Sequence, residues 1–572
     1  MDRSGTPLNM VRANNHRFAG RRAAGILLAA LPILFLAVFF FYPLLSILQI
    51  SLIPDGTLDL SGFAELITSD YYRRVFFFTV QQAVLSTVIT LAMALPAAFV
   101  FARFEFPGKS LLLSLATLPF VLPTVVVAAA FGALIGEHGV INSVIVSLFG
   151  LSDVPIQLEG TVAIILIAHA FYNYSVALRI IGSYWATLSP RMDEAARVLG
   201  AHGWRLWWTI RLPALRPAIL AAAALVFIFT FTSFGVVLIL GGIRFATLEV
   251  EIFNQARNLF NLNMAAALSL VQIGFMFIVM LIYTRLSRAA TADIQAARAV
   301  ARKPRTKGEN ALVVITVGVM MVFQFAPLLA LIWRSFTVGD QGFTTRYYSA
   351  LSTNPRGSVL FAPPLEAIGN SVSIALITTV LAVVLGMLTA YLLARRDSWA
   401  ARALDAVFML PLATSAVTLG FGFIIALDEP PLNLRASPLM IPLAHTLVAL
   451  PFVVRSILPG LRSISPNIRG AAAVMGASPF TVWRTIDLPL ISRGVIVGAV
   501  FAFTISMGEF GASLFIARPD TPTIPVVIFR LLGQPGAGNY GQALAMSVIL
   551  MGVCAISFIT IERLRKLGMG EF

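Results

Sequence analysis

The sequence has 572 residues, of which 58% are hydrophobic and only 12% are charged. Soluble domains carry about 25% charged residues, so this composition excludes a water-soluble globule and indicates a membrane protein. The formal net charge is +15, but the basic residues lie between apolar runs, which indicates membrane topology and no nucleic-acid partner. The single cysteine, Cys554, excludes an internal disulfide and a cysteine-based metal site.

The chain begins with a basic tail followed by an apolar run. The tail contains five arginines, and the run extends from about Gly25 to Leu52. This run is too long for a signal-peptide core, and no small-residue cleavage site follows it. We therefore predict that residues 1–24 form a cytoplasmic tail and that a retained membrane helix follows.

Further apolar runs continue to the end of the chain. A spanning helix needs roughly 20 apolar residues, and such runs lie near residues 25–50, 76–101, 110–136, 160–183, 216–241, 264–286, 311–335, 367–394, 404–427, 437–456, 494–517 and 542–562. Lysine and arginine concentrate in alternate connections, whereas the connection 137–159 has neither. Because cytoplasmic loops retain basic residues, this pattern predicts an all-α polytopic protein with about twelve transmembrane helices and both termini in the cytoplasm.

The second half of the sequence repeats the first. His169 and His445 begin similar runs 276 positions apart, and the same offset links Pro213 with Pro489. Upstream the offset becomes 292, because one outside connection is shorter in the second half. Six spans is an even number, so the repeats have the same orientation in the membrane. We predict two parallel six-helix repeats, at residues 25–288 and 311–563. A cytoplasmic linker at 289–310 would join them, and residues 564–572 would form a cytoplasmic C-terminal tail.

Two inside segments at equivalent positions carry the densest pattern. Each begins at a proline, Pro190 or Pro466, has a glycine ten residues later, and returns to the membrane at a Leu-Pro pair. Proline suits the first turn of a short helix and glycine suits its end, so two short helices are expected in each segment. Charged and aromatic residues interleave there, as in amphipathic helices that occupy a partner's groove.

These segments closely resemble the EAA loop of permeases from binding-protein-dependent ABC importers, although Gly470 replaces the glutamate in the second copy. In that family the loop forms a coupling helix that docks onto an ATP-binding subunit. The resemblance therefore implies two ATP-binding cassette subunits, a periplasmic or lipid-anchored substrate-binding protein, and a multi-pass location in the bacterial inner membrane, in contact with the lipid bilayer. The residues that it assigns to coupling are Glu194, Ala195, Ala196, Gly200, Leu212, Pro213, Ala471, Ala472, Gly476, Leu488 and Pro489.

Polar residues within the apolar runs are candidates for the translocation path, namely His169, Asn173, Ser233, His445 and Glu509. Such residues also join packed membrane helices through hydrogen bonds, and we favour this packing role for the two histidines. An ionisable residue inside a membrane is a functional hypothesis by default. For Glu509 we favour the alternative of a packing or gating role.

A single chain that supplies both halves further resembles the ferric-iron and thiamine permeases of this superfamily. The stretches 168–173, 233–242 and 506–511 look closer to the thiamine permease. The resemblance implies thiamine or its phosphates as the first candidate cargo and ferric iron as the second. Transport would proceed by alternating access between outward-facing and inward-facing states.

The motif search predicts a transport subunit without an ATPase site of its own. Gly108-Lys109-Ser110 resembles the end of a phosphate-binding loop, but Arg103 stands where that loop requires its first glycine. We expect no catalytic site, metal site or cofactor in this chain. The alternative is a secondary transporter driven by an ion gradient, which would need carboxylates within several spans, whereas the sequence offers Glu509 and, near a helix end, Asp405.

Overall fold

The computed structural model describes residues 30–54, 56–242, 244–292, 301–338, 342–354, 360–394, 399–428, 430 and 432–567. Within these ranges the regular structure is helical, apart from one isolated β-bridge between Phe104 and Arg302. Eleven of the described helical segments are long and apolar enough to cross a membrane, and one bent pair supplies a twelfth. The predicted all-α architecture with about twelve membrane helices is therefore confirmed.

The helices of the two halves follow one another in the same order. Those of the first half are α2 (Tyr42–Leu52), α3 (Ser61–Thr68), α4 (Asp70–Arg103), α5 (Lys109–Leu115), α6 (Leu118–Val121), α7 (Thr124–Ile135), α8 (Val140–Phe149), α9 (Val162–Thr187), α10 (Arg191–Val198), α11 (Gly203–Leu206), α12 (Leu212–Phe231), α13 (Gly235–Leu240), α14 (Leu248–Phe253) and α15 (Leu262–Ala292). Those of the second half are α16 (Lys307–Thr337), α17 (Arg346–Ser349), α18 (Pro364–Ala394), α19 (Trp399–Ala413), α20 (Ala416–Leu427), α21 (Met440–Ser463), α22 (Pro466–Val474), α23 (Pro479–Val482), α24 (Leu488–Gly508), α25 (Gly511–Ile516), α26 (Ile524–Leu532) and α27 (Ala537–Leu567).

The third predicted span of each half is broken, so the prediction of continuous helices at 110–136 and 404–427 is wrong. In the first half the run divides into α5, α6 and α7. Leu122 is extended at ψ 144°, because the ring of the following Pro123 excludes its neighbour from the helical region. In the second half the segments Arg402–Leu412 and Ala416–Leu427 meet at an angle of 92°.

The fifth predicted span of each half lies nearer the N-terminus than expected, because the unbroken helical stretches are Gly203–Phe231 and Pro479–Gly508. The runs 216–241 and 494–517 are not continuous, because α12 ends at Phe231 and α24 ends at Gly508. The short helices α13 and α25 follow after these breaks. Consequently Ser233 and Glu509, which are equivalent in the repeat, both lie in breaks between helices.

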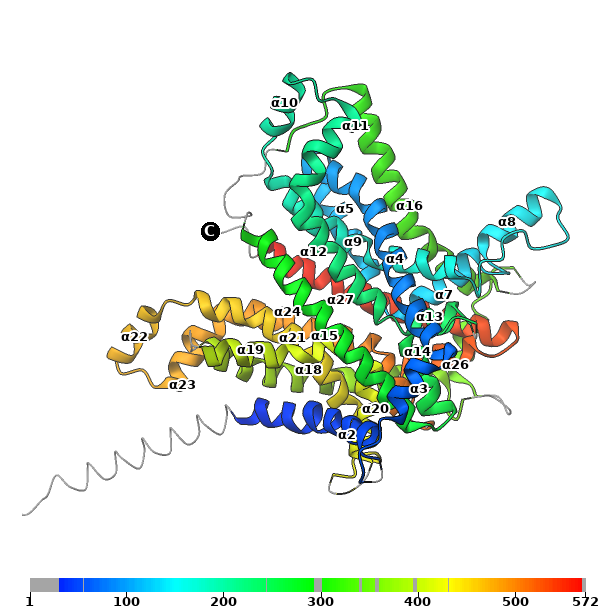
Figure 1. Cartoon of the computed structure of the whole chain (residues 1–572), viewed down its shortest axis with the longest axis vertical. Helices are drawn as coiled ribbons and strands as arrows, with labels where there is room; N and C mark the ends of the chain where they lie inside the picture. Colours follow the sequence, from blue (N-terminus) through cyan, green and yellow to red (C-terminus); the bar gives the residue numbers. More distant parts are fainter. Residues whose placement is uncertain are drawn as a thin grey trace, which may run out of the picture.

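Each half is built on a three-helix bundle, and its first helix packs on the other half. Helices α4, α9 and α12 pack together, as do the equivalent α18, α21 and α24. Helix α2 packs against α20 and also against α15, whereas α16 packs against α7, α4 and α27 (Figure 1). The two halves of the sequence are therefore not separate packing units, because these exchanged helices bury apolar surface across the boundary.

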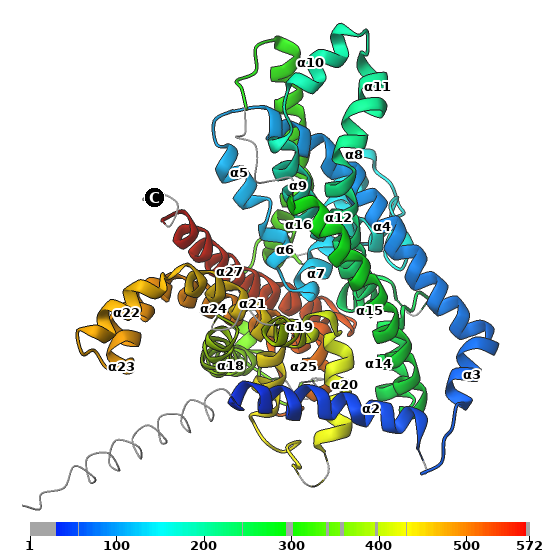
Figure 2. The ribbon, with the colours of Figure 1, turned by 60° about the vertical axis from the view of Figure 1, so that its left-hand side comes forward.

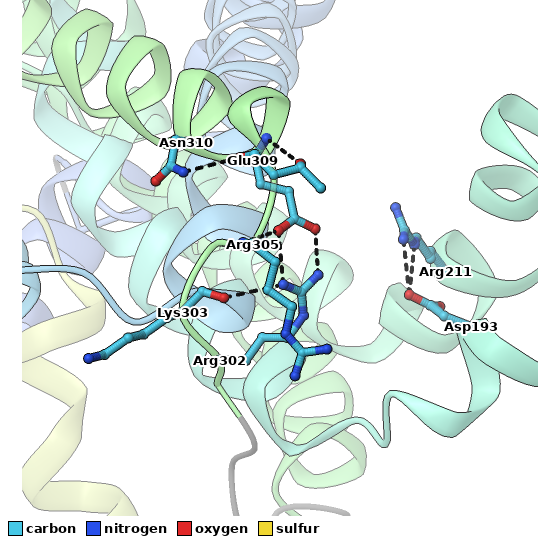
Figure 3. A network of polar contacts seen from close by, with 8 residues as sticks. Asp193, Arg211, Arg302, Lys303, Arg305, Glu309 and Asn310 are labelled. Atoms are coloured by element: carbon cyan, nitrogen blue, oxygen red, sulfur yellow. Dashed lines mark hydrogen bonds and ion pairs between the residues drawn. The ribbon is translucent and has the colours of Figure 1, made fainter.

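The chain between the halves is fastened to the end of α4 where the structure describes it. The backbone N–H of Arg302 donates to the carbonyl oxygen of Arg103 at 3.1 Å, and the Arg302 guanidinium lies 5.4 Å from the centre of the Phe104 ring. The Glu309 carboxylate accepts from Arg302 Nη1 at 2.9 Å and raises the pKa of that guanidinium (Figure 3). Thr306 caps α16 by accepting the N–H of Glu309. These contacts hold α16 beside the first half.

Candidate functional site

Two pairs of short helices stand at separate projecting tips of the molecule. Helices α10 and α11 form the tip of the first half, and α22 and α23 form the tip of the second half (Figure 2). The end of α27 lies between the two tips in both views. These tips are the segments whose sequence resembles the coupling loop.

The two tips turn in the same way at their glycines. Gly200 has φ +83° and Gly476 has φ +84°, in the left-handed region that favours glycine. The N–H of Ala201 donates to the Ala196 carbonyl at 2.9 Å, and the N–H of Ala477 donates to the Ala472 carbonyl at 3.0 Å. This bond across six residues ends each helix in a Schellman motif. A Cβ atom at either glycine would meet no atom of the described residues within 4 Å, so a side chain there would strain the backbone and would not clash.

The tips expose large apolar side chains at equivalent positions. Val198 is 88% exposed and its equivalent Val474 is 90% exposed. Three further pairs are Met192 with Ile468, Leu199 with Met475, and Trp204 with Phe480, all of them exposed. A matched set of exposed apolar residues indicates a surface that is covered by a partner.

The other residues assigned to coupling fall into three places. Ala196 and Ala472 are buried beneath the tips, whereas Glu194, Ala195 and Ala471 are exposed on them. The Leu-Pro pairs begin the next membrane helices, and they are Leu212 and Pro213 at α12 and Leu488 and Pro489 at α24. The structure therefore brings each set of residues together within its own half.

A cavity of about 410 Å³ lies between the halves. Residues at the break between α6 and α7, in α9 and at the break after α12 line it from the first half, and residues at the start of α20, in α21, in α24 and at the following break line it from the second. Four of the five predicted path residues line this cavity: His169, Asn173, Ser233 and Glu509. His445 is fully buried next to Glu509.

The cavity wall is rich in aromatic rings. Phe234 and Phe510, which are equivalent in the repeat, stack across the boundary of the halves with ring centroids 5.5 Å apart. The aromatic residues of the wall are Phe120, Tyr172, Phe229, Phe234, Phe452, Phe501 and Phe510. Such a wall suits a flat ring, and the faces of aromatic rings attract cations.

The two histidines join helices through buried hydrogen bonds. His169 lies 3.0 Å from Ser86 Oγ and 2.8 Å from Ser233 Oγ. His445 lies 2.8 Å from Ser506 Oγ and is also in contact with Ser513. His169 thus links α9 to α4 and to the break after α12, and His445 links α21 to α24 and α25 on the two sides of the equivalent break.

Glu509 is held by the protein on both carboxylate oxygens. Oε1 accepts the N–H of Ala512 at 2.8 Å, and Oε2 accepts the N–H of Ser513 at 2.9 Å. His445 Nε2 lies 3.2 Å from Oε2. The carboxylate therefore satisfies free N–H groups at the start of α25 as well as lining the cavity.

Asn173 lines the cavity and has a buried side-chain acceptor that is unused. Its side chain is 3% exposed, and its Nδ2 donates to the His169 carbonyl at 3.0 Å. Its Oδ1 has no hydrogen-bond partner among the described residues. A buried acceptor without a partner is costly, so this atom is suited to a donor from a bound molecule.

Glu249 and Glu251 are buried carboxylates that the sequence did not indicate, since only Glu509 and Asp405 stood out there. Glu249 is fully buried in α14 and accepts from Ser415 Oγ of the second half at 2.6 Å. Glu251 is 1% exposed and accepts from Tyr71 at 2.7 Å. Both residues lie between apolar runs, where carboxylates are ordinarily solvated, so the sequence carried no signal of their burial.

Comparisons with known proteins cover nearly the whole chain. The profile of the family described as "binding-protein-dependent transport system inner membrane component" matches residues 94–291 and 382–566, one segment in each half. The thiamine transport system permease protein ThiP of Brucella abortus (strain 2308) is 27% identical over 503 residues, covering 87% of this chain and 89% of that protein. ThiP of Salmonella typhimurium is 26% identical over 516 residues, covering 88% and 91%. The ferric transport system permease protein FbpB of Actinobacillus pleuropneumoniae is 26% identical over 549 residues, covering 92% and 76%.

Proposed function

We propose a cargo, a set of partners and a mechanism for this chain, which belongs to the family of binding-protein-dependent transport system inner membrane components. It is a multi-pass permease of an ABC importer. The matches support this ATP-driven class over the ion-gradient alternative.

The partners that we propose are two ATP-binding subunits, one on each tip, and a substrate-binding protein on the opposite side of the membrane. The equivalent exposed pairs Val198 with Val474 and Trp204 with Phe480 support one docking surface per half. ATP hydrolysis would take place on these subunits. The tips and both termini would then lie in the cytoplasm, in agreement with the basic residues of the inside connections.

Alternating access would arise from relative motion of the halves around the cavity. The stacked Phe234 and Phe510 and the bond between Glu249 and Ser415 are contacts that such motion would have to break or shift. Because both contacts cross between the halves beside the breaks in the membrane helices, small rotations there would open or close the cavity.

The first candidate cargo is thiamine or one of its phosphates, and the cavity is the observation that carries it. Thiamine has aromatic rings, a positive charge and an amino group. The aromatic wall offers stacking and cation–π contacts, and Asn173 Oδ1 offers an acceptor for an amino group. Ferric iron is the second candidate, because a ferric permease covers 92% of this chain.

Uptake into proteoliposomes tests the proposal. The reconstituted complex would contain the permease, its ATP-binding subunits and a cargo-loaded binding protein, with labelled thiamine and labelled ferric iron in parallel. We expect Asn173→Ala to lower the maximal thiamine uptake rate about fivefold, as loss of one hydrogen bond of about 1 kcal/mol implies. Ser175→Ala is the matched control, since Ser175 lies on the same helix, is 2% exposed and is not part of the cavity wall. Uptake of iron without thiamine would contradict the cargo, and uptake of neither would contradict the function.

A further inference from the structure

Each tip is tied to the membrane helix that follows it by an ion pair, and the two pairs have opposite polarity. In the first half Asp193 of α10 accepts from Arg211 at 3.0 Å (Figure 3). In the second half Arg469 of α22 donates to Asp487 at 2.8 Å. These are equivalent positions of the repeat with their charges exchanged. The same link is therefore made twice by different residues.

The surroundings of the pairs have changed together with the charges. The Arg211 guanidinium lies 5.0 Å from the centre of the Phe99 ring. At the equivalent position in the second half, Tyr391 donates its hydroxyl to Asp487 at 3.1 Å. A ring face suits a cation and a phenol hydroxyl suits a carboxylate, so each half has a neighbour that suits its own charge.

The pairs are partly shielded from solvent. The side chains of Asp193 and Arg211 are 14% and 17% exposed, and that of Asp487 is 8% exposed. Arg103 lies 3.6 Å from Asp193 and adds a second cation in the first half. Removing one partner of a shielded pair leaves the other charge uncompensated, which is more disruptive than loss of an exposed pair.

The pairs stand at the mechanical junction between tip and cavity. Arg211 and Asp487 each end a five-residue π-helical turn, at Trp207–Arg211 and Trp483–Asp487, and each is followed by Leu-Pro. The helical stretches Gly203–Phe231 and Pro479–Gly508 run unbroken through these turns and end close to the cavity residues Ser233 and Glu509, so each ion pair ties α10 or α22 to the side of such a stretch. A helix of 21 residues is about 32 Å long, so each pair holds such a stretch at about that distance from the end that borders the cavity.

We propose that Asp193 with Arg211 and Arg469 with Asp487 are positioning residues that transmit movement of the tips to the cavity. Each pair holds a tip in fixed orientation to its helix, so that force from an ATP-binding subunit turns the helix and does not merely bend the loop. What each half requires is the pair and not a particular charge at either position. This inference rests on the proposed docking of ATP-binding subunits at the tips.

Exchange of charges in the second half tests the proposal. Arg469→Asp and Asp487→Arg are made singly and together, and the double variant has the charge order of the first half. In the reconstituted complex we expect each single variant to lower uptake per ATP hydrolysed at least tenfold. The double variant should recover to within about twofold of the unaltered complex, with the new arginine beside the Tyr391 ring as Arg211 is beside Phe99.

The controls separate positioning from folding and from the proposed function itself. Exchange of the exposed pair Arg518 and Asp520, whose side chains are 51% and 66% exposed, should leave uptake per ATP unchanged. If a single charge reversal prevents assembly, the neutral variants Arg469→Gln and Asp487→Asn replace it. These variants should also lower uptake per ATP hydrolysed. Normal coupling in assembled single variants, or no recovery in the double variant, would overturn the proposal. Failure of the unaltered complex to couple ATP to uptake would instead contradict the proposed function.

Discussion

Replacement of Gly476 by alanine should weaken docking at the second tip through the backbone alone. Gly476 has φ +84°, and a Cβ atom there would meet no other atom within 4 Å. Alanine in the left-handed region costs about 1–2 kcal/mol. Gly470, six residues earlier, has equally open surroundings but lies within helix α22. Alanine is favoured over glycine by about 1 kcal/mol in a helix interior, so Gly470→Ala should be neutral or slightly stabilising to the tip.

The two variants are matched in size, location and exposure, so their difference isolates the turn. The strain and the helix preference together separate them by about 2–3 kcal/mol. If the unbound tip relaxes and the bound tip requires the native turn, Gly476→Ala should weaken the affinity for the ATP-binding subunit roughly 5- to 30-fold, since 1.4 kcal/mol is a factor of ten.

Titration of the detergent-solubilised permease with the purified ATP-binding subunit measures this affinity. Gly476→Asn is the third variant, and it should retain most of the affinity because asparagine tolerates the left-handed region. Equal affinities for Gly476→Ala and Gly470→Ala would refute the argument that the left-handed turn is required for docking.

Three further predictions concern contacts within the permease. Glu509→Gln should lower the free energy of unfolding by roughly 1.5–3 kcal/mol, because an amide offers one acceptor oxygen where the carboxylate uses two. A variant with unchanged stability and lost uptake would show instead that the charge serves the cargo. Glu249→Ala and Ser415→Ala should show a coupling of about 1–3 kcal/mol in a double-mutant cycle of thermal unfolding, because either change removes the hydrogen bond. Additivity would contradict the link between the halves. Thr306→Ala should cost about 1 kcal/mol through loss of the cap of α16, measured in the same way, and an unchanged stability would show that the cap is dispensable.

The sequence was sufficient for features that depend on local pattern. Apolar runs and basic connections predicted the membrane helices, because the hydrophobic length and flanking charge of each segment largely determine whether and how it inserts into the bilayer. A constant offset between His169 and His445 revealed the two related halves. The spacing from Pro190 to Gly200 predicted a short helix with a glycine at its end, which the structure places in the left-handed region.

The tertiary structure alone decided how these segments meet. The exchange of α2 and α16 between the halves, and the burial of Glu249 against Ser415, depend on which helix lies beside which. The breaks at Ser233 and Glu509 fall within runs that are apolar enough to read as single spans. The Asn173 oxygen, which has no partner among the described residues, and the reversed pairs at the tips likewise became visible only in the tertiary structure. Hydropathy determines that a segment enters the membrane, whereas the direction in which each polar group points is fixed by packing against its neighbours.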